Sequence, residues 1–275
     1  MSPVKIMVNG LPGNVSKNIA EMISTHRGIE LVPYSLTGSD IEESWIGIGD
    51  IVVKLIKPEA RDTVIDNIIL SEGPFISVDY THPSAVNENA EFYSRKKLHF
   101  IMGTTGGDRK QLFKTVSDSE ICAVIAPNMA KQIVGVQAVV EYAAKTFPDL
   151  FKDYTLEISE SHQAGKADTS GTARAMAGYL KKLGPDFNEN QIQKERDPEI
   201  QKNIWKIPEK YIKGHGWHTY TLTSKDKTAK FSFTHNICGR DIYTEGTLDA
   251  VNFLNSKIKS GIKGYVFTMV DVLKR

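Results

Sequence analysis

The sequence contains little cysteine. Cys122 and Cys238 are its only two, far apart and outside any C-x-x-C or Cys/His pattern. This scarcity argues against a disulfide framework and against a zinc site, so we expect no metal centre. Two unpaired thiols fit a reducing compartment.

The sequence also lacks an excess of either charge. Lys and Arg total 34 against 33 Asp and Glu, which leaves a formal net charge of +1. Without a long-range field of one sign, nucleic acid, a membrane surface and polyanionic partners are not expected.

Long apolar runs are absent as well. No stretch reaches the roughly 18 apolar residues that a membrane-spanning helix needs. Strand-like residues 4–8 follow the amino terminus almost at once and leave no room for a signal peptide, although a chain that had lost a transit peptide would look the same. We therefore expect a cytoplasmic protein, or one of the plastid stroma in the second case.

Alternating strand and helix patterns occupy the first half of the chain. With 275 residues and 40% hydrophobic content, the chain can bury a core of one large or two modest domains. The expected strands are 6–8, 31–34, 51–55, 75–78, 100–102 and 122–125, and the helices between them are 15–23, 58–70, 85–93 and 110–116. This order predicts an α/β domain with a doubly wound, Rossmann-like parallel sheet.

The pattern changes after Asn128. Helices are expected at 130–147 and 173–183, strands at 154–161, 218–223, 230–236 and 242–246, and a final helix at 247–257. A polar stretch separates the second helix from the last strands. We expect an α+β substrate domain with a mixed open sheet at 130–246, and a dinucleotide-binding domain made of 1–129 and 247–275.

The loop after the first strand resembles a dinucleotide loop. Gly10 would permit a tight turn, and Gly13 would let the backbone approach a pyrophosphate at the start of the next helix, beside Asn14 and Val15. Ser16 stands where the third glycine of the fingerprint is expected. A plain strand-turn-helix therefore remains an alternative.

The residues after the second strand bear on the choice of cofactor. A carboxylate here would bond the adenosine ribose of NADH, but none occurs before Asp40. The hydroxyls of Ser35 and Thr37 could bond a 2′-phosphate instead. NADPH is therefore at least as acceptable as NADH, although no arginine stands beside these residues.

Two further loops follow predicted strands, at the sheet edge where open α/β sheets bind ligands. They are Asp79-Tyr80-Thr81 and Gly103-Thr104-Thr105-Gly106. We assign Tyr80, Thr81, Gly103 and Thr105 to the cofactor site, with ordinary turns as the alternative.

The segment 160–173 brings an imidazole, an ammonium group and a helix start together. His162 leaves the end of a strand, Lys166 adds a mobile positive charge, and Ser170-Gly171-Thr172 opens a helix whose N–H groups can bind an anion. Alternatively, Ser170 only caps the helix and the loop is solvated.

Taken in order, these motifs resemble dihydrodipicolinate reductase of lysine biosynthesis, over nearly the whole chain. They are Gly10-Leu11-Pro12-Gly13, Asp79-Tyr80-Thr81, Gly103-Thr104-Thr105-Gly106, Ala126-Pro127-Asn128-Met129 and the run from His162 to Thr172. The sequences around Val8-Asn9-Gly10 and Glu160-Ser161-His162-Gln163 resemble those of the plant-type branch of this family.

The resemblance implies NAD(P)H-dependent reduction of 4-hydroxy-tetrahydrodipicolinate, a small cyclic dicarboxylate, to tetrahydrodipicolinate. It also implies a homo-oligomer, a dimer or tetramer, formed through the sheet of the second domain. By this resemblance His162 is the acid, Lys166 binds substrate, and Thr105 is shared between nicotinamide and substrate. The remaining implied contacts are Ser170, Gly171 and Thr172 for a carboxylate and Pro127, Asn128 and Met129 for the cofactor.

One departure concerns Gln163, which stands where bacterial members usually carry a second histidine. Glutamine can donate a hydrogen bond but cannot titrate, so it keeps a binding role only. The histidines at 215, 218 and 235 are interpreted as structural or interfacial. Arg240 could face the substrate or form a surface ion pair.

Two other functions remain open at this point. A semialdehyde dehydrogenase would need an activated cysteine, and Cys122 lies inside an apolar strand while Cys238 lacks a neighbouring motif. A non-catalytic NAD(P)-binding redox sensor would bind cofactor without consuming it.

Overall fold

The computed structural model describes residues 2–274. The chain divides into two compact units. Unit 1 comprises Met1–Lys131 and Asp241–Arg275, and unit 2 comprises Gln132–Arg240.

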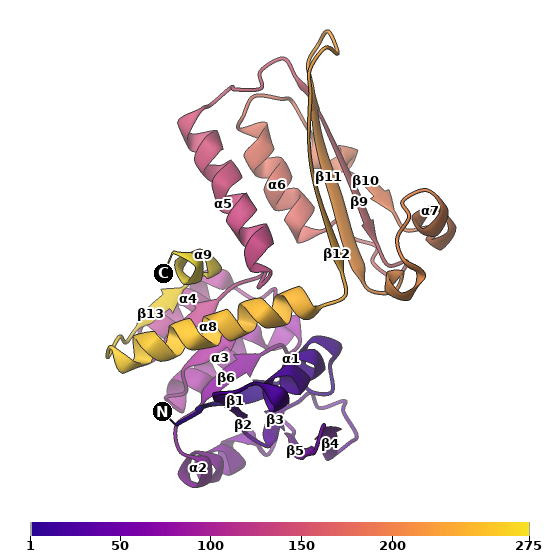
Figure 1. The fold of residues 1–275 in the computed structure, drawn as a ribbon. Helices are drawn as coiled ribbons and strands as arrows, with labels where there is room; N and C mark the ends of the chain where they lie inside the picture. Colours follow the sequence, from indigo (N-terminus) through magenta and orange to yellow (C-terminus); the bar gives the residue numbers. More distant parts are fainter. Residues whose placement is uncertain (1, 275) are drawn as a thin grey trace. The chain divides into compact units, whose positions relative to one another are not determined.

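A six-stranded sheet forms the centre of unit 1 (Figure 1), and every neighbouring pair in it is parallel. Its strands are short and apolar because both faces are covered. In spatial order they are β13 (Tyr265–Phe267), β8 (Cys122–Ile125), β7 (Phe100–Met102), β6 (Ile76–Asp79), β1 (Val4–Asn9) and β2 (Ile29–Leu31).

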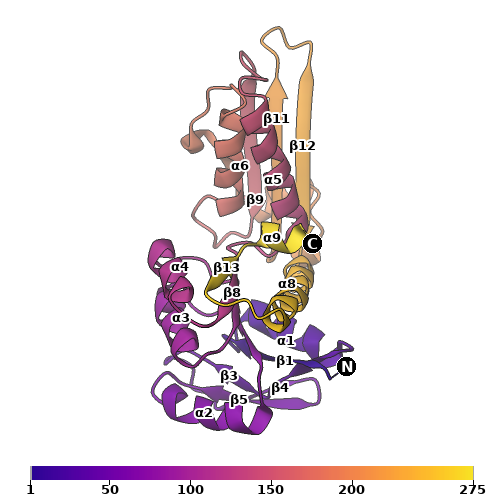
Figure 2. The same cartoon turned by 90° about the vertical axis from the view of Figure 1, so that its left-hand side faces the viewer.

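Helices cover this sheet on both faces (Figure 2), which confirms the doubly wound arrangement. On one side α3 packs against α4, and on the other α1 packs against α8. The helices of unit 1 are α1 (Asn14–Thr25), α2 (Arg61–Glu72), α3 (Val86–Arg95), α4 (Arg109–Ser117), α8 (Asp241–Lys259) and α9 (Met269–Leu273). Phe92, Tyr93 and Phe100 are fully buried in the core between sheet and helices.

The strand expected at 31–34 is in fact two strands in two sheets. β2 ends at Leu31, and the chain resumes as β3 (Tyr34–Leu36), which pairs with β5 (Ile51–Ile56) beside β4 (Trp45–Ile48) in a three-stranded sheet. Pro33 lies between the two strands and cannot donate a ladder hydrogen bond, so it marks the change of sheet. A continuous apolar run concealed this break.

Unit 2 is built on the expected mixed sheet, in which β9 pairs parallel with β10 and antiparallel with β11, and β11 pairs antiparallel with β12. Its strands are β10 (Gln193–Glu195), β9 (Thr155–His162), β11 (His215–Thr223) and β12 (Lys230–Cys238), and its helices are α5 (Lys131–Thr146), α6 (Gly171–Lys181) and α7 (Pro198–Asn203). Short 3-10 turns lie at 83–85, 189–191 and 209–211.

The core of unit 2 follows from the spacing of apolar residues. Along α6, Ala173, Met176, Ala177 and Leu180 are buried, a spacing that places them on one helical face. That face packs on alternate residues of β9 and β11, among them Leu156, Ile158, Tyr220 and Leu222. The result fixes β9, whose last residue is His162, against the helix that starts at Gly171.

The strand predicted at 242–246 is wrong, because these residues begin α8. Its buried positions include Thr244, Thr247, Leu248 and Val251, which follow helical and not alternating spacing. Gly246 lies against the backbone of Met129, where a Cβ would come within 1.7 Å of the carbonyl oxygen. The residues expected to close the second domain therefore belong to unit 1.

The polar stretch 184–202, to which the sequence assigned no helix or strand, contains β10 and most of α7. Asp197 caps α7 by accepting from the N–H groups of Glu199 and Ile200, a signal that was overlooked. Within residues 2–274, no helix is both long enough and apolar enough to cross a membrane.

Candidate functional site

The glycine loop of unit 1 is held in a shape that only glycine permits. Gly10 has φ of +99°, and a Cβ there would lie 2.2 Å from the Tyr80 carbonyl oxygen. Ser16 replaces the third glycine without opening the loop, because its Oγ donates toward the Gly10 and Gly13 carbonyl oxygens at 2.8 and 2.9 Å. The hydroxyl therefore closes the turn from which α1 begins.

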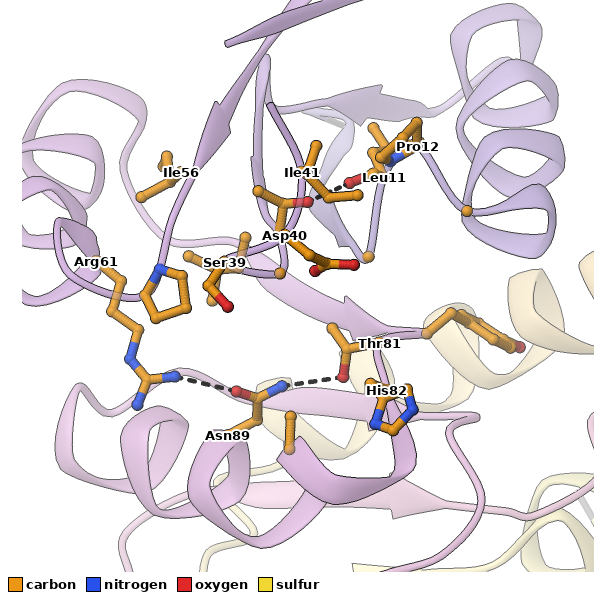
Figure 3. Close-up of a pocket in the computed structure, with 18 of the residues that line it drawn as sticks. Leu11, Pro12, Ser39, Asp40, Ile41, Ile56, Arg61, Thr81, His82 and Asn89 are labelled. Atoms are coloured by element: carbon orange, nitrogen blue, oxygen red, sulfur yellow. Dashed lines mark hydrogen bonds between the residues drawn. The ribbon is translucent and has the colours of Figure 1, made fainter. Parts of the chain in front are cut away.

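A cavity of about 730 Å³ opens beside this loop (Figure 3). It lies where the strand order reverses between β1 and β6, the place where doubly wound sheets bind ligands. Six of the residues assigned to the cofactor line it, namely Gly10, Gly13, Asn14, Thr37, Tyr80 and Thr81.

The other residues assigned to the cofactor do not line this cavity; they are Val15, Ser35, Gly103, Thr105, Pro127, Asn128 and Met129. Ser35 is buried, and its Oγ accepts from the Leu11 N–H at 3.3 Å, so it supports the loop. Gly103 lies against the Tyr80 ring, because a Cβ added at Gly103 would come within 2.3 Å of the Tyr80 Cε1. Thr105 is exposed, whereas its neighbour Thr104 is buried.

Two charged residues that the sequence did not assign to the site also line the cavity. Besides Glu88 on α3, they are Asp40, after β3, and Arg61, the first residue of α2. Arg61 pairs with Glu88 and donates to the Asn89 Oδ1 at 3.2 Å (Figure 3). Only the fold brings this arginine to the same cavity as Thr37, because 24 positions separate them in the sequence.

A buried carboxylate orders the loops that follow β6 and β7. Asp79 accepts from the Tyr93 hydroxyl at 2.7 Å and from the hydroxyls of Thr81 and Thr104 at 2.8 Å each. Asn89 donates to it at 3.0 Å. This network fixes Thr81 at the cavity wall and explains why Thr104 is turned inward.

In unit 2, His162 is the last residue of β9 and is partly buried. Its Nδ1 lies 3.2 Å from the carbonyl oxygen of His215, and its Nε2 lies 3.3 Å from the Nε2 of His218. A carbonyl can only accept, so Nδ1 carries a proton and Nε2 holds the lone pair of the neutral ring. Burial, followed by the charges of Arg196 and Lys166, lowers the pKa of His162 to about 4.

Gly216 makes room for the His162 ring. It faces His162 across the antiparallel pair, and a Cβ there would approach His162 Cε1 to 3.0 Å. The absence of a side chain at this position therefore sets where the imidazole lies.

An ion pair between Glu160 and Arg196 holds the neighbouring loop. Glu160 is fully buried, and its Oε1 accepts from the Arg196 guanidinium while its Oε2 accepts from the Ser170 N–H at 3.0 Å. Arg196 also donates from Nε to the Lys166 carbonyl oxygen at 2.7 Å and from Nη2 to that of Asp168 at 3.3 Å. Sequence reasoning missed Arg196, which lies in the polar stretch. The signal in the sequence was Glu160, a carboxylate that follows Leu156 and Ile158 at alternate positions of the strand and so falls on its apolar face.

Lys166 and Gln163 belong to the loop that Arg196 holds. The Lys166 Nζ lies 2.9 Å from the Asp168 Oδ1, and its side chain is 25% exposed. Gln163 accepts at its carbonyl oxygen from the Lys166 N–H at 3.0 Å, which closes the turn.

The start of α6 offers fewer donors than its sequence suggests. Ser170 gives its N–H to Glu160, and the Thr172 N–H donates to the Ser170 Oγ at 3.3 Å. The exposed Gly171 and the hydroxyl hydrogen of Ser170 are the groups at this helix start best placed for an anion.

His162 and two side chains near it also have metal-ligating atoms. One such atom each from Glu160, His162 and His218 lies within 4.8 Å of the others. Glu160 is already neutralised by Arg196, and two cations close to His162 disfavour a third. The contacts of this cluster are those of a histidine pair beside a buried ion pair.

Cys122 is not an activated nucleophile. Cys122 is buried in β8, and burial raises the pKa of its thiol to about 11. A thiol with that pKa is protonated at neutral pH and unreactive. This disfavours the semialdehyde dehydrogenase alternative.

Comparison with protein families gives two matching family models, which together cover nearly the whole chain. The model "Dihydrodipicolinate reductase, N-terminus" matches residues 4–129, and "Dihydrodipicolinate reductase, C-terminus" matches residues 133–273. The chain is 44% identical to "Probable 4-hydroxy-tetrahydrodipicolinate reductase 2, chloroplastic" of Oryza sativa subsp. japonica, over 98% of this chain and 82% of that one. It is 43% identical to "4-hydroxy-tetrahydrodipicolinate reductase 2, chloroplastic" of Arabidopsis thaliana, over 98% and 77% of the two chains.

A solved structure shares the fold. The "Dipicolinate bound Dihydrodipicolinate reductase" from Paenisporosarcina sp. TG-14 aligns with a TM-score of 0.68 and 18% identity, covering 97% of this chain and 98% of that one. Two family models that together span nearly all of the chain, and plant relatives above 40% identity, agree with the resemblance noted in the sequence. The chain belongs to the dihydrodipicolinate reductase family.

Proposed function

We propose that unit 1 binds NADPH and that unit 2 binds the ring of the cyclic dicarboxylate 4-hydroxy-tetrahydrodipicolinate and supplies the proton for its reduction. Family membership makes the chain an oxidoreductase of lysine biosynthesis. The observation that carries the residue assignment is the grouping of His162, Lys166 and the start of α6 around the Glu160–Arg196 pair.

The reaction defines what the residues must do. Loss of water from the 4-hydroxy form leaves a conjugated imine, and NADPH bound in unit 1 would supply the hydride that reduces this ring. The electron pair displaced through the ring then takes one proton, so one NADPH and one proton yield tetrahydrodipicolinate, water and NADP⁺. His162 Nε2 is the atom proposed to give that proton.

The two carboxylates of the substrate need fixed donors and a positive charge. Lys166 supplies the charge, and Gly171 with the Ser170 hydroxyl supplies donors at the helix start. Gln163 and Thr172 remain proposed contacts through their side chains. Thr105 keeps its proposed contact with nicotinamide and substrate, since its exposed side chain is open to a ligand.

Binding of a dianion also resolves the protonation state of His162. Burial lowers the pKa of His162 most, and the positive charges of Arg196 and Lys166 lower it further. Two substrate carboxylates beside them would offset these charges and raise the pKa of His162 toward neutrality. The imidazole would then become a proton donor only when substrate is present.

The residues that line the cofactor cavity favour NADPH as the cofactor more strongly than the sequence alone did. Arg61 and Ser39 line it together with Thr37, whose hydroxyl donates to the Leu11 carbonyl oxygen at 2.6 Å, and a guanidinium is well suited to a phosphate. Asp40 lines the same cavity and could bond the free ribose hydroxyls of NADH. We propose use of both cofactors, with NADPH at least as efficient.

The sheet of unit 2 is the proposed contact of a homo-oligomer, a dimer or tetramer. β12 is the last strand in the order of this sheet, and Phe231 and Phe233 are 52% and 38% exposed on it. Exposed aromatic side chains on a strand at the edge of a sheet favour association. The plant relatives are named as chloroplastic, and we propose the plastid stroma or the cytoplasm for this chain.

A coupled assay tests this function. Substrate is generated from pyruvate and aspartate semialdehyde, and loss of NADPH and of NADH is followed separately. We expect oxidation of either cofactor only when both precursors are present. Binding of NADPH without any such oxidation would instead support the redox-sensor alternative.

A further inference from the structure

His218 lies next to His162 but has no place in the reaction described so far. It is buried on β11, and its ring centroid lies 5.0 Å from that of His162 and 4.6 Å from that of His235 on β12. Within residues 2–274, its Nδ1 has no hydrogen-bond partner. Only its Nε2 therefore makes polar contacts.

The protons on the two rings can be assigned from their partners. The Nδ1–H of His162 donates to the His215 carbonyl oxygen, so the His162 Nε2 can only accept while the ring is neutral. The atom that faces this lone pair is the His218 Nε2, at 3.3 Å. For that contact to be a hydrogen bond, His218 must carry its proton on Nε2.

This arrangement cannot persist once His162 is protonated. Both facing nitrogens would then carry hydrogen, and one of them must turn to another acceptor. The Glu160 Oε2 lies 3.7 Å from the His218 Nε2 and is such an acceptor.

We propose that His218 is a positioning residue for His162: it donates its Nε2–H to the His162 lone pair in the free protein and transfers that hydrogen bond to Glu160 when His162 takes up its proton. The proposal rests on the role of His162 as proton donor. His218 thus keeps the neutral His162 ring in place before the substrate binds. Once His162 is charged, the N–H of His218 points to Glu160 and no longer opposes the proton on the His162 Nε2.

Glu160 is suited to receive this bond because it is fixed. Arg196 binds its Oε1, and the Ser170 N–H binds its Oε2, which retains a second lone pair. A small rotation of the His218 ring would close the remaining gap.

The groups that face the two rings favour a His218 that stays neutral. They are Glu160 on β9, Lys166 and Arg196 at the loop, His215 on β11 and His235 on β12. Burial, followed by the neighbouring imidazoles, lowers the pKa of His218 to about 2. The ring therefore carries one proton throughout, and only the partner of that proton changes.

Kinetics of three variants test the proposal. His218→Gln keeps an N–H donor near the position of Nε2, whereas His218→Met has a similar volume and no donor. His235→Gln is the matched control, because it alters the same stack of rings. The His235 Nε2 lies 3.4 Å from the Tyr220 hydroxyl and makes no bond to His162.

In the coupled assay we expect His218→Met to lower kcat about tenfold with little change in KM. His218→Gln should keep more than half of kcat, and His235→Gln should behave like the unaltered protein. An unchanged kcat in His218→Met would overturn the proposal. An equal loss in His235→Gln would also overturn it, since the effect would then come from the stability of the stack.

Imidazole ¹⁵N spectra of the unaltered protein provide a test that does not depend on a variant folding. Signals of His162 and His218 are expected to show protons on Nδ1 and Nε2, respectively. Saturation with pyridine-2,6-dicarboxylate, a stable planar dicarboxylate, should charge His162 while His218 keeps its proton on Nε2. A proton on Nδ1 of His218 in either state would overturn the proposal for His218. The proposed reduction would still stand in that case if the coupled assay shows turnover.

Discussion

Removing the charge of Lys166 should weaken catalysis mainly through substrate binding. Lys166→Met keeps most of the side-chain length and removes the cation proposed to face a substrate carboxylate. A charge-assisted hydrogen bond lost from a site that excludes water is worth about 2 to 3 kcal/mol. In the free protein, however, Lys166 is paired with the exposed Asp168 at 2.9 Å, and displacing such a pair costs up to about 1 kcal/mol.

The net loss is therefore about 2 kcal/mol, so we expect kcat/KM to fall about thirtyfold, chiefly through a higher KM. Asp168→Asn is the matched control, since it removes the competing carboxylate and leaves Lys166 free for substrate. Its kcat/KM should rise severalfold. The coupled assay measures both, with circular dichroism and NADPH binding to verify folding. A Lys166→Met protein within threefold of the unaltered kcat/KM would place this lysine in a solvated loop without a catalytic function.

Three further predictions concern the cofactor, the position of His162 and acid stability. NADPH should be used at least as efficiently as NADH, and Arg61→Gln should lower kcat/KM for NADPH about tenfold more than for NADH; a tenfold preference of the unaltered protein for NADH would contradict the role of Arg61. Gly216→Ala should displace the His162 ring, whose Cε1 would lie 3.0 Å from the added Cβ. The variant should have a lower kcat and an almost unchanged affinity for NADPH. A kcat equal to that of the unaltered protein would show that the ring has room to move. The pKa values of His162, His218 and His235 are lowered to about 4, about 2 and about 4, below the usual 6.5, so the unfolded chain takes up protons first as the pH falls. Stability is therefore fully present above about pH 6.5, and urea unfolding should show a loss of several kcal/mol between pH 7.5 and 5, up to about 2 kcal/mol for each ring. Equal stability at the two pH values would contradict the burial of these neutral rings.

Much of the fold could be predicted because local patterns and burial agree. The strands of the six-stranded sheet are short apolar runs between amphipathic helices, so their order in the sequence already indicates a parallel sheet. The prediction failed at residues 242–246, where a short run that begins with the strand-like residues Ile242, Tyr243 and Thr244 forms the first turns of α8. There, burial on a helical face and the close approach of Gly246 to Met129 outweigh strand propensity.

The candidate site was predictable where its residues are adjacent in sequence. Lys166 and Ser170 lie within one loop after His162, so their spacing alone placed them together. Arg196 and His218 reach the same place only because β10 and β11 flank β9, and sequence separation hides pairings of that kind. Arg61 was missed for the same reason, since the start of α2 meets the loop after β3 only in the folded unit.

The measurement that tests the central claim most directly is kcat of His162→Gln as a function of pH, in the coupled assay with NADPH. Glutamine keeps much of the size and hydrogen bonding of histidine but cannot donate a titrating proton. General acid catalysis is typically worth about a hundredfold to ten-thousandfold, so we expect kcat to fall by that factor with little change in KM, and the high-pH limb of the profile to disappear. Binding of NADPH and of pyridine-2,6-dicarboxylate should be unchanged in the same protein. Retention of more than a tenth of kcat with an unaltered pH profile would show that another group supplies the proton and that His162 only binds the substrate.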